Sequence, residues 1–270
     1  MWLFNSSIGR KVVMSVTGLA LILFLTFHMS MNVVALFSAE AYNTICELLG
    51  ANWYAVVATL GLAGLAVLHI LYAFILTIQN RKARGNSRYA VTDKPAKVEW
   101  ASQNMLVLGL IVLVGLLVHL YNFWAKMMLV ELVGCEEGAA LAADGAHWIQ
   151  YTFTQPVYVV LYLVWLCALW FHLTHGFWSA IQTMGWNGKT WFCRWKVIGN
   201  AYATLLFLGF AVVVLAAFFG FIAPEAAADC CDAAQGCAHH ACEAAAGCAH
   251  EMGECAKHAC EAVADTCCAQ

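Results

Sequence analysis

The sequence predicts an all-α integral membrane protein, in which residues 1–223 form a bundle of five membrane-spanning helices. The chain has 270 residues, of which 63% are hydrophobic and only 11% are charged, whereas soluble domains contain about 25% charged residues. Five apolar runs also reach the roughly 20 residues that a helix needs to cross a bilayer. These runs are residues 12–37, 53–78, 105–130, 156–184 and 197–222.

The first run predicts a helix rather than a signal peptide, because it exceeds the usual apolar core of about 7–15 residues and no small-x-small cleavage site follows it. Basic residues lie before the first run, between the second and third, and between the fourth and fifth, and the opposite loops are acidic. By the positive-inside rule the N-terminus is cytoplasmic and the C-terminal tail periplasmic. We therefore expect a multi-pass protein of the bacterial inner (cytoplasmic) membrane, surrounded by lipid and without a nucleic-acid partner.

Histidines occur in four consecutive apolar runs. His28, His69 and His119 lie in the first three runs, and His172 and His175 lie in the fourth. An ionisable residue inside a span is costly and marks a functional site by default. One such histidine alone is equally well explained as a neutral imidazole bonded to a backbone carbonyl or a serine. Four consecutive runs that each carry one indicate a shared function.

The histidines fall into two layers along the bundle. His28 and His119 each lie 12 residues before an outer glutamate, which is about 18 Å at 1.5 Å per residue. His69 lies 12 residues before the inner basic residues, and His172 and His175 are also in the inner half. In an up-down bundle of the first four helices, the members of each layer come from diagonal partners that face each other across the core.

Two facing imidazoles at one depth favour a six-coordinate haem iron. A b-type haem is held by its axial ligands and apolar packing, and the Cys-x-x-Cys-His attachment motif is absent from the sequence. Zinc needs three or four converging ligands. Glycines on the same runs predict either room for a flat macrocycle or ordinary close packing of helices. They are Gly18, Gly61, Gly64, Gly109, Gly115 and Gly176.

Four stretches, in order, carry a resemblance to a known family. They are TGLALILFLTFHM, LHILYAF, VHLYNFW and FHLTHGFWSAIQTMGW. Over residues 1–223 the chain resembles the di-haem cytochrome b membrane anchor subunit of succinate dehydrogenases and fumarate reductases, the succinate:quinone oxidoreductase family. The resemblance implies a four-helix haem-binding core with two haem b groups, the outer held by His28 and His119 and the inner by His69 and His172.

The resemblance also implies the activity, and the positions of several residues along the chain suggest further contacts. A flavoprotein subunit interconverts succinate and fumarate, as in the tricarboxylic acid cycle, and an iron–sulfur subunit links it to this chain. The chain exchanges electrons with a membrane quinone, expected to be menaquinone. It has no dinucleotide fingerprint or ferredoxin-like cysteine run, so it does no dicarboxylate chemistry alone. Candidate propionate contacts are His175, Ser15, Trp100 and Gln182, and Glu47 is the candidate quinone-site residue, although each is equally explained as an interfacial or solvated side chain.

Two other functions remain open from the sequence. One is the di-haem cytochrome b anchor of another quinone-linked dehydrogenase or hydrogenase, which would differ only in its soluble subunits. The other is a metal-handling membrane protein without haem, in which the histidines relay a metal captured by the C-terminal tail. The basic loop of residues 81–97 favours docking of soluble subunits, or simply sets the topology and contacts anionic lipid.

Residues 224–270 form a separate tail with nine of the thirteen cysteines and four of the ten histidines. The octapeptide CAHHACEA recurs as CAKHACEA 18 residues later, an offset of five helical turns. Three interpretations stay open: a helical hairpin stapled by disulfides in an oxidising compartment, a Cys/His metal-binding appendage, and a low-complexity tail with little function.

Overall fold

The computed structural model describes residues 6–50, 52–84, 99–133 and 142–222, and these residues contain helices and turns but no strand. Five helical segments are long and apolar enough to cross a membrane, which confirms the all-α, multi-pass class. The chain divides into two units, Met1–Ala223 and Pro224–Gln270. Every described residue belongs to the first unit, so the predictions for the cysteine-rich tail fall outside the described residues.

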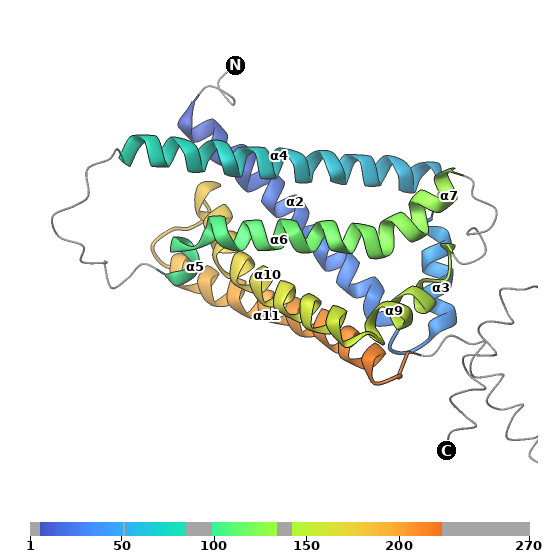
Figure 1. Cartoon of the computed structure of the whole chain (residues 1–270). Coiled ribbons are helices and arrows are strands. Elements are labelled where there is room, and N and C mark those ends of the chain that lie inside the picture. Colours follow the sequence, from blue (N-terminus) through green and yellow to red (C-terminus); the bar gives the residue numbers. More distant parts are fainter. Residues whose placement is uncertain (1–5, 51, 85–98, 134–141, 223–270) are drawn as a thin grey trace, which may run out of the picture. The chain divides into compact units, whose positions relative to one another are not determined.

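The spans follow the chain in the predicted order (Figure 1). Each contains 28–31 residues, about 42–46 Å at 1.5 Å per residue, which exceeds the roughly 30 Å hydrocarbon core. Both ends of each span therefore reach the polar interface. The spans are α2 (Ser7–Val34), α4 (Trp53–Arg84), a continuous segment made of α6 (Met105–His119), η1 (Leu120–Leu129) and α7 (Val130–Val133), then α10 (Pro156–Thr183) and α11 (Trp191–Phe218).

The helix ends differ from the ends of the apolar runs. Helix α2 begins at Ser7 and α11 at Trp191, five to six residues before the predicted starts, because helical hydrogen bonding continues through interfacial polar residues. The Ser6 hydroxyl caps α2 by accepting a hydrogen bond from the Gly9 amide at 2.9 Å, as N-cap serines do. Gly185 and Gly220, with φ of 80° and 77°, end α10 and α11 in the left-handed conformation that glycine adopts without strain.

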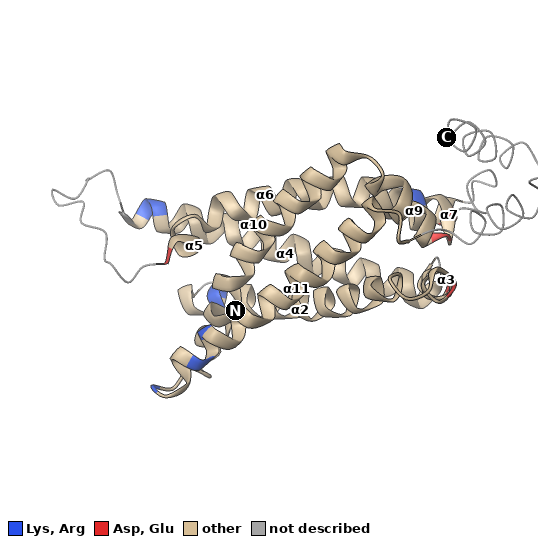
Figure 2. Cartoon of the chain, turned by 90° about the horizontal axis from the view of Figure 1, so that it is seen from below, with Lys and Arg blue, Asp and Glu red and all other residues tan. Residues whose placement is uncertain are grey.

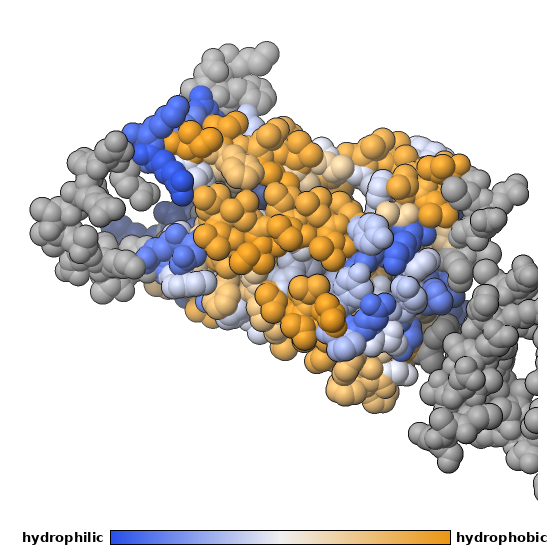
Figure 3. Space-filling view, viewed as in Figure 1, coloured by the Kyte–Doolittle hydropathy of each residue, from blue (hydrophilic) through white to orange (hydrophobic). Residues whose placement is uncertain are grey.

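Helix α10 is the centre of the bundle. It packs against α2, α6 and α11, and α2 also packs against α4 and α11. Ile22 of α2, Leu173 of α10 and Leu206 of α11 form a buried apolar cluster at this junction. By contrast, α4 packs extensively against α2 alone among the described helices. Many of its apolar side chains are exposed, and the space-filling view shows a broad hydrophobic surface of the kind that faces lipid (Figure 3).

Two short helices that the sequence did not predict lie together at one end of the bundle, α3 (Ala39–Leu48) and α9 (Gly145–Phe153). Asn43 of α3 joins them, because its Nδ2 donates to Asp144 Oδ1 and its Oδ1 accepts from the Ala146 amide, both at 2.9 Å. Tyr42 and Cys46 of α3 contact Gly145, where a Cβ atom would overlap both side chains. This polar and steric fit fixes α3 against α9.

The third span is not a regular α-helix throughout. Immediately after His119 it continues as the π-helical segment η1, whose wider i→i+5 turns often occur at functional sites. Asn122 in this segment is buried, and its Nδ2 lies 3.3 Å from the Tyr162 hydroxyl of α10. This change of helix type was not predicted from the sequence.

Charged residues are concentrated at the ends of the spans (Figure 2). Among the described residues, Lys126 is the exception to the predicted basic end, because it lies near the α3–α9 end. Its ammonium group lies 4.9 Å from the Trp148 ring centroid and 5.0 Å from that of Tyr151, as expected for a lysine in an interfacial aromatic belt. Which end faces the cytoplasm stays a prediction.

The packing of α3 on α9 predicts an unreactive thiol at Cys46. The pKa of this thiol is raised to about 11: burial is the largest cause and nearby Asp144 adds to it, whereas hydrogen bonds with Tyr42 and the Gly145 backbone act in the opposite direction. Only the thiolate reacts with alkylating agents. We expect Cys46 alkylation to be slow at pH 8 and to increase up to about pH 11, measured by peptide mass spectrometry on the full chain in detergent. Exposed Cys193 is the internal control, and Cys46 labelling as fast as Cys193 at pH 8 would contradict the packing.

Candidate functional site

The outer pair consists of His28 on α2 and His119 on α6. Their ring centroids lie 5.8 Å apart with the planes at 83°. The ring of Phe24 stacks on His28 at 5.4 Å, and the indole of Trp165 lies 5.6 Å from His119. The structure therefore brings together the two histidines that were paired because of their equal depth, and aromatic side chains surround them.

The inner pair consists of His69 on α4 and His172 on α10. Their ring centroids lie 6.4 Å apart with the planes at 67°. Each ring rests against a glycine of a neighbouring helix: a Cβ built at Gly18 would lie 3.3 Å from Cε1 of His69, and one at Gly109 would lie 3.7 Å from Cε1 of His172. These two glycines of the six predicted ones thus make room beside the inner histidines.

Both pairs bridge helices that barely touch each other. Neither α2 with α6 nor α4 with α10 is among the extensively packed helix pairs, whereas α2 packs on α4 and α6 packs on α10. The pairs therefore lie across the two diagonals of the four helices, as the sequence predicts. The predicted four-helix core is seen only in part, because α4 and α6 are not extensively packed either.

The two layers are separated by a similar distance along two different helices. On α2, Gly18 contacts the inner pair and His28 belongs to the outer pair. On α6, Gly109 contacts the inner pair and His119 belongs to the outer pair. Each interval is ten residues, about 15 Å at 1.5 Å per residue. Two independent helices thus give the same spacing between the layers.

The paired rings fit as two ligands of one metal centre. A metal–imidazole bond is about 2 Å long and each nitrogen lies just over 1 Å from its ring centroid, so rings bound on opposite sides of one ion are about 6 Å apart. Buried Nδ1 atoms of His119 and His172 have no hydrogen-bond partner, a situation that costs about 1–3 kcal/mol per group. Among the described residues no group of three or more His, Cys, Asp or Glu side chains converges. This donor set suits a haem, whose macrocycle supplies the other ligands, better than zinc.

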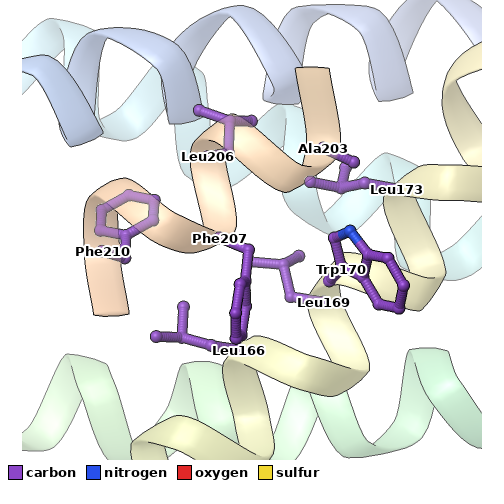
Figure 4. A pocket seen from close by; sticks show the side chains of 8 residues that line it. All are labelled: Leu166, Leu169, Trp170, Leu173, Ala203, Leu206, Phe207 and Phe210. Atoms are coloured by element: carbon purple, nitrogen blue, oxygen red, sulfur yellow. The ribbon is translucent and has the colours of Figure 1, made fainter. Parts of the chain in front are cut away.

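A pocket between α10 and α11 is a separate feature (Figure 4). Four side chains from each helix line it, and none of them is a histidine. Its cavity volume is about 10 Å³, far below the roughly 300–1,000 Å³ of small-molecule sites. One of the lining residues, Phe210, lies near the outer pair, with its ring 5.7 Å from that of His28.

His175 faces a polar cluster rather than the inner pair. Its Nδ1 lies 3.9 Å from Oε2 of Glu99, beyond hydrogen-bond distance. Glu99 also accepts hydrogen bonds from the Lys196 ammonium at 2.7 Å and from the Trp178 indole at 3.3 Å. The sequence analysis missed Glu99, Lys196 and Trp178, because the contacts join residues 79 and 97 positions apart.

The other predicted contacts differ in their surroundings. Ser15 is buried on α2, whereas Trp100 at the start of α5 (Trp100–Gln103) is 58% exposed and Gln182 near the end of α10 is also exposed. Glu47 is exposed on α3. The roles of these four residues as propionate or quinone contacts stay predictions.

No protein-family model matches this chain, and neither the curated proteins nor the solved structures include a match to it. The resemblance to succinate:quinone oxidoreductase anchors therefore rests on the sequence motifs, and the functional argument rests on the geometry of the two histidine pairs.

Two glycine substitutions should have opposite effects on stability. A Cβ at Gly115 would overlap the Trp165 indole, which packs beside His119 and donates to the Val112 carbonyl at 3.0 Å. Gly115→Ala should therefore destabilise the protein by about 1–3 kcal/mol, the usual cost of overpacking. Gly61→Ala is the matched control, because nothing lies within 4 Å of its Cβ position, and alanine in a helix gains about 0.5–1 kcal/mol over glycine.

Thermal unfolding in detergent, followed by intrinsic tryptophan fluorescence, measures both variants. Equal midpoints for the Gly115 and Gly61 variants would show that Trp165 does not pack against α6 as described.

Proposed function

We propose that this chain is the membrane anchor of a succinate dehydrogenase or fumarate reductase complex, and that it carries two b haems between an iron–sulfur subunit and a membrane quinone. The fold supports the first part of this proposal, since its helices are long and apolar enough to cross a membrane. The motifs quoted above support the particular family. The haems, partners and quinone are the proposed part.

The single observation that carries the proposal is the presence of two histidine pairs with nearly equal geometry. Ring centroid separations of 5.8 and 6.4 Å suit two imidazoles that bind one metal ion, and the pairs lie about 15 Å apart along the bundle. Nδ1 of His119 and of His172 has no hydrogen-bond partner, but the same holds for His175, so the pairing of the rings carries the proposal. One group bound between the two rings of each pair accounts for that pairing.

The chain's own side chains would hold and isolate each cofactor. Bound haem would supply a one-electron carrier. His28 and His119 would fix the outer group, with Phe24 and Trp165 excluding water around them. His69 and His172 would fix the inner group, beside the glycines that leave space at Gly18 and Gly109.

The two ends of the bundle have different proposed partners. The basic end, with α5 and the Glu99–Lys196 ion pair, would face the iron–sulfur and flavoprotein subunits. The α3–α9 end would lie near the quinone, for which menaquinone is the proposed type and Glu47 the proposed contact. The exposure of Glu47 leaves it available to exchange protons with water.

The anchor of another quinone-linked dehydrogenase or hydrogenase would carry the same histidine pairs, so copurified subunits distinguish it. A zinc relay without haem is less consistent with the described residues, because a zinc site needs three or four converging protein ligands, and no such group is found there.

Histidine substitutions test the proposal position by position. His69→Ala or His172→Ala should remove the inner haem, and His28→Ala or His119→Ala the outer one, because a b haem has no covalent link to retain it. Haem per polypeptide, measured as the pyridine haemochrome, should fall from about two to about one in each variant.

The matched control is His175→Ala, one helical turn from His172, which should keep both haems. A His172 variant with two haems together with a His175 variant with one would show that the assignment on α10 is wrong. Two haems in all five variants would rule out the histidine pairs as ligands.

A further inference from the structure

Thr17 of α2 is a polar residue buried inside the bundle, with 4% of its surface exposed. Its hydroxyl lies 2.9 Å from the Val13 carbonyl and 3.1 Å from the Met14 carbonyl of its own helix. Carbonyls only accept hydrogen bonds, so the single hydroxyl hydrogen of Thr17 points to the backbone. Its oxygen lone pairs remain available on the other side.

The third atom close to this hydroxyl belongs to one of the paired histidines. Nδ1 of His69 lies 3.2 Å from Thr17 Oγ1. If the threonine hydrogen points to the helix backbone, the hydroxyl accepts from the ring and Nδ1 carries the proton. His69 also has a backbone hydrogen bond with Met14 of α2, whose carbonyl can only accept, so the ring is the donor in that bond. A neutral imidazole has one N–H and one lone pair, so Nε2 of His69 is then the nitrogen with the free lone pair.

Gly18, the residue after Thr17, leaves room for the His69 ring in this position. The Cβ site at Gly18 lies 3.3 Å from Cε1 and 3.7 Å from Nδ1 of His69, so a side chain there would press on the ring. Thr17 and Gly18 of α2 therefore both lie against the His69 ring of α4. By comparison, the buried Nδ1 atoms of His119 and His172 have no partner.

We infer that Thr17 is a positioning residue for the inner centre: its hydroxyl accepts the Nδ1–H of His69, fixes the tautomer, and thereby presents Nε2 as the axial ligand with increased basicity. This inference rests on the proposed function, because it concerns the haem held by His69 and His172. A hydrogen bond from the far nitrogen of a ligating histidine orients the ring and makes it a stronger donor. A stronger donor favours the oxidised metal, so the bond should lower the reduction potential of the inner haem relative to a centre without it.

The test is a potentiometric titration of the purified full-length protein with three substitutions. Thr17→Val has nearly the same shape but no hydroxyl, and it should raise the midpoint potential of the inner haem while leaving the outer one unchanged. Thr17→Ser restores the acceptor and should restore the wild-type potential. Thr26→Val is the matched control, because Thr26 is on the same helix and its hydroxyl contacts Tyr202 of α11 rather than a histidine.

The outcomes separate the two proposals. An inner potential that is unchanged in Thr17→Val, or raised equally in Thr26→Val, overturns the role of Thr17 and leaves the di-haem proposal standing. A wild-type protein without haem overturns the di-haem proposal and the role of Thr17 with it. If Thr17→Val does not retain the inner haem, Thr17→Ala is measured instead. An inner-haem midpoint potential of Thr17→Ala that equals that of Thr17→Ser overturns the inference.

Discussion

A buried imidazole in a membrane-spanning helix is costly unless the protein supplies a partner for it, because lipid offers no hydrogen bonds. Four consecutive spans of this chain carry such a ring, and this constraint explains much of the arrangement. The rings meet in two pairs across the diagonals of the four helices. Small residues and aromatic rings surround the pairs. The helices across each diagonal therefore meet at the paired rings and do not pack extensively against each other.

The helices that do pack provide the frame for these pairs. Helix α10 contacts α2, α6 and α11, and an apolar cluster around Leu173 and Leu206 joins them. Helix α4 lacks this support, since among the described helices α2 is its only extensive neighbour. The bond between His69 and Thr17 is a polar link between these two helices, and it ties the most exposed span to the bundle at the level of the inner pair.

The sequence predicts the depth of a residue in a membrane helix well and its rotation poorly. The rise of 1.5 Å per residue sufficed to sort His28 with His119 and to place His69 in one layer with His172 or His175. The family resemblance selected His172, and the structure brings His69 together with this ring. To predict the contact between His69 and Thr17 one must know the relative rotation of α2 and α4, and residue spacing does not determine that rotation. The same holds for Glu99 and Lys196, which are 97 positions apart. Helices α3 and α9 were missed because they are short and lie in segments that read as polar loops.

The most direct test of the account is a reduced-minus-oxidised visible spectrum of the purified full-length protein, combined with a pyridine haemochrome assay. If the histidine pairs hold haem iron, the spectrum is of the b type and the assay gives about two haems per chain. A colourless protein would contradict the central claim, and elemental analysis that found a bound metal in it would assign the histidines to metal handling instead.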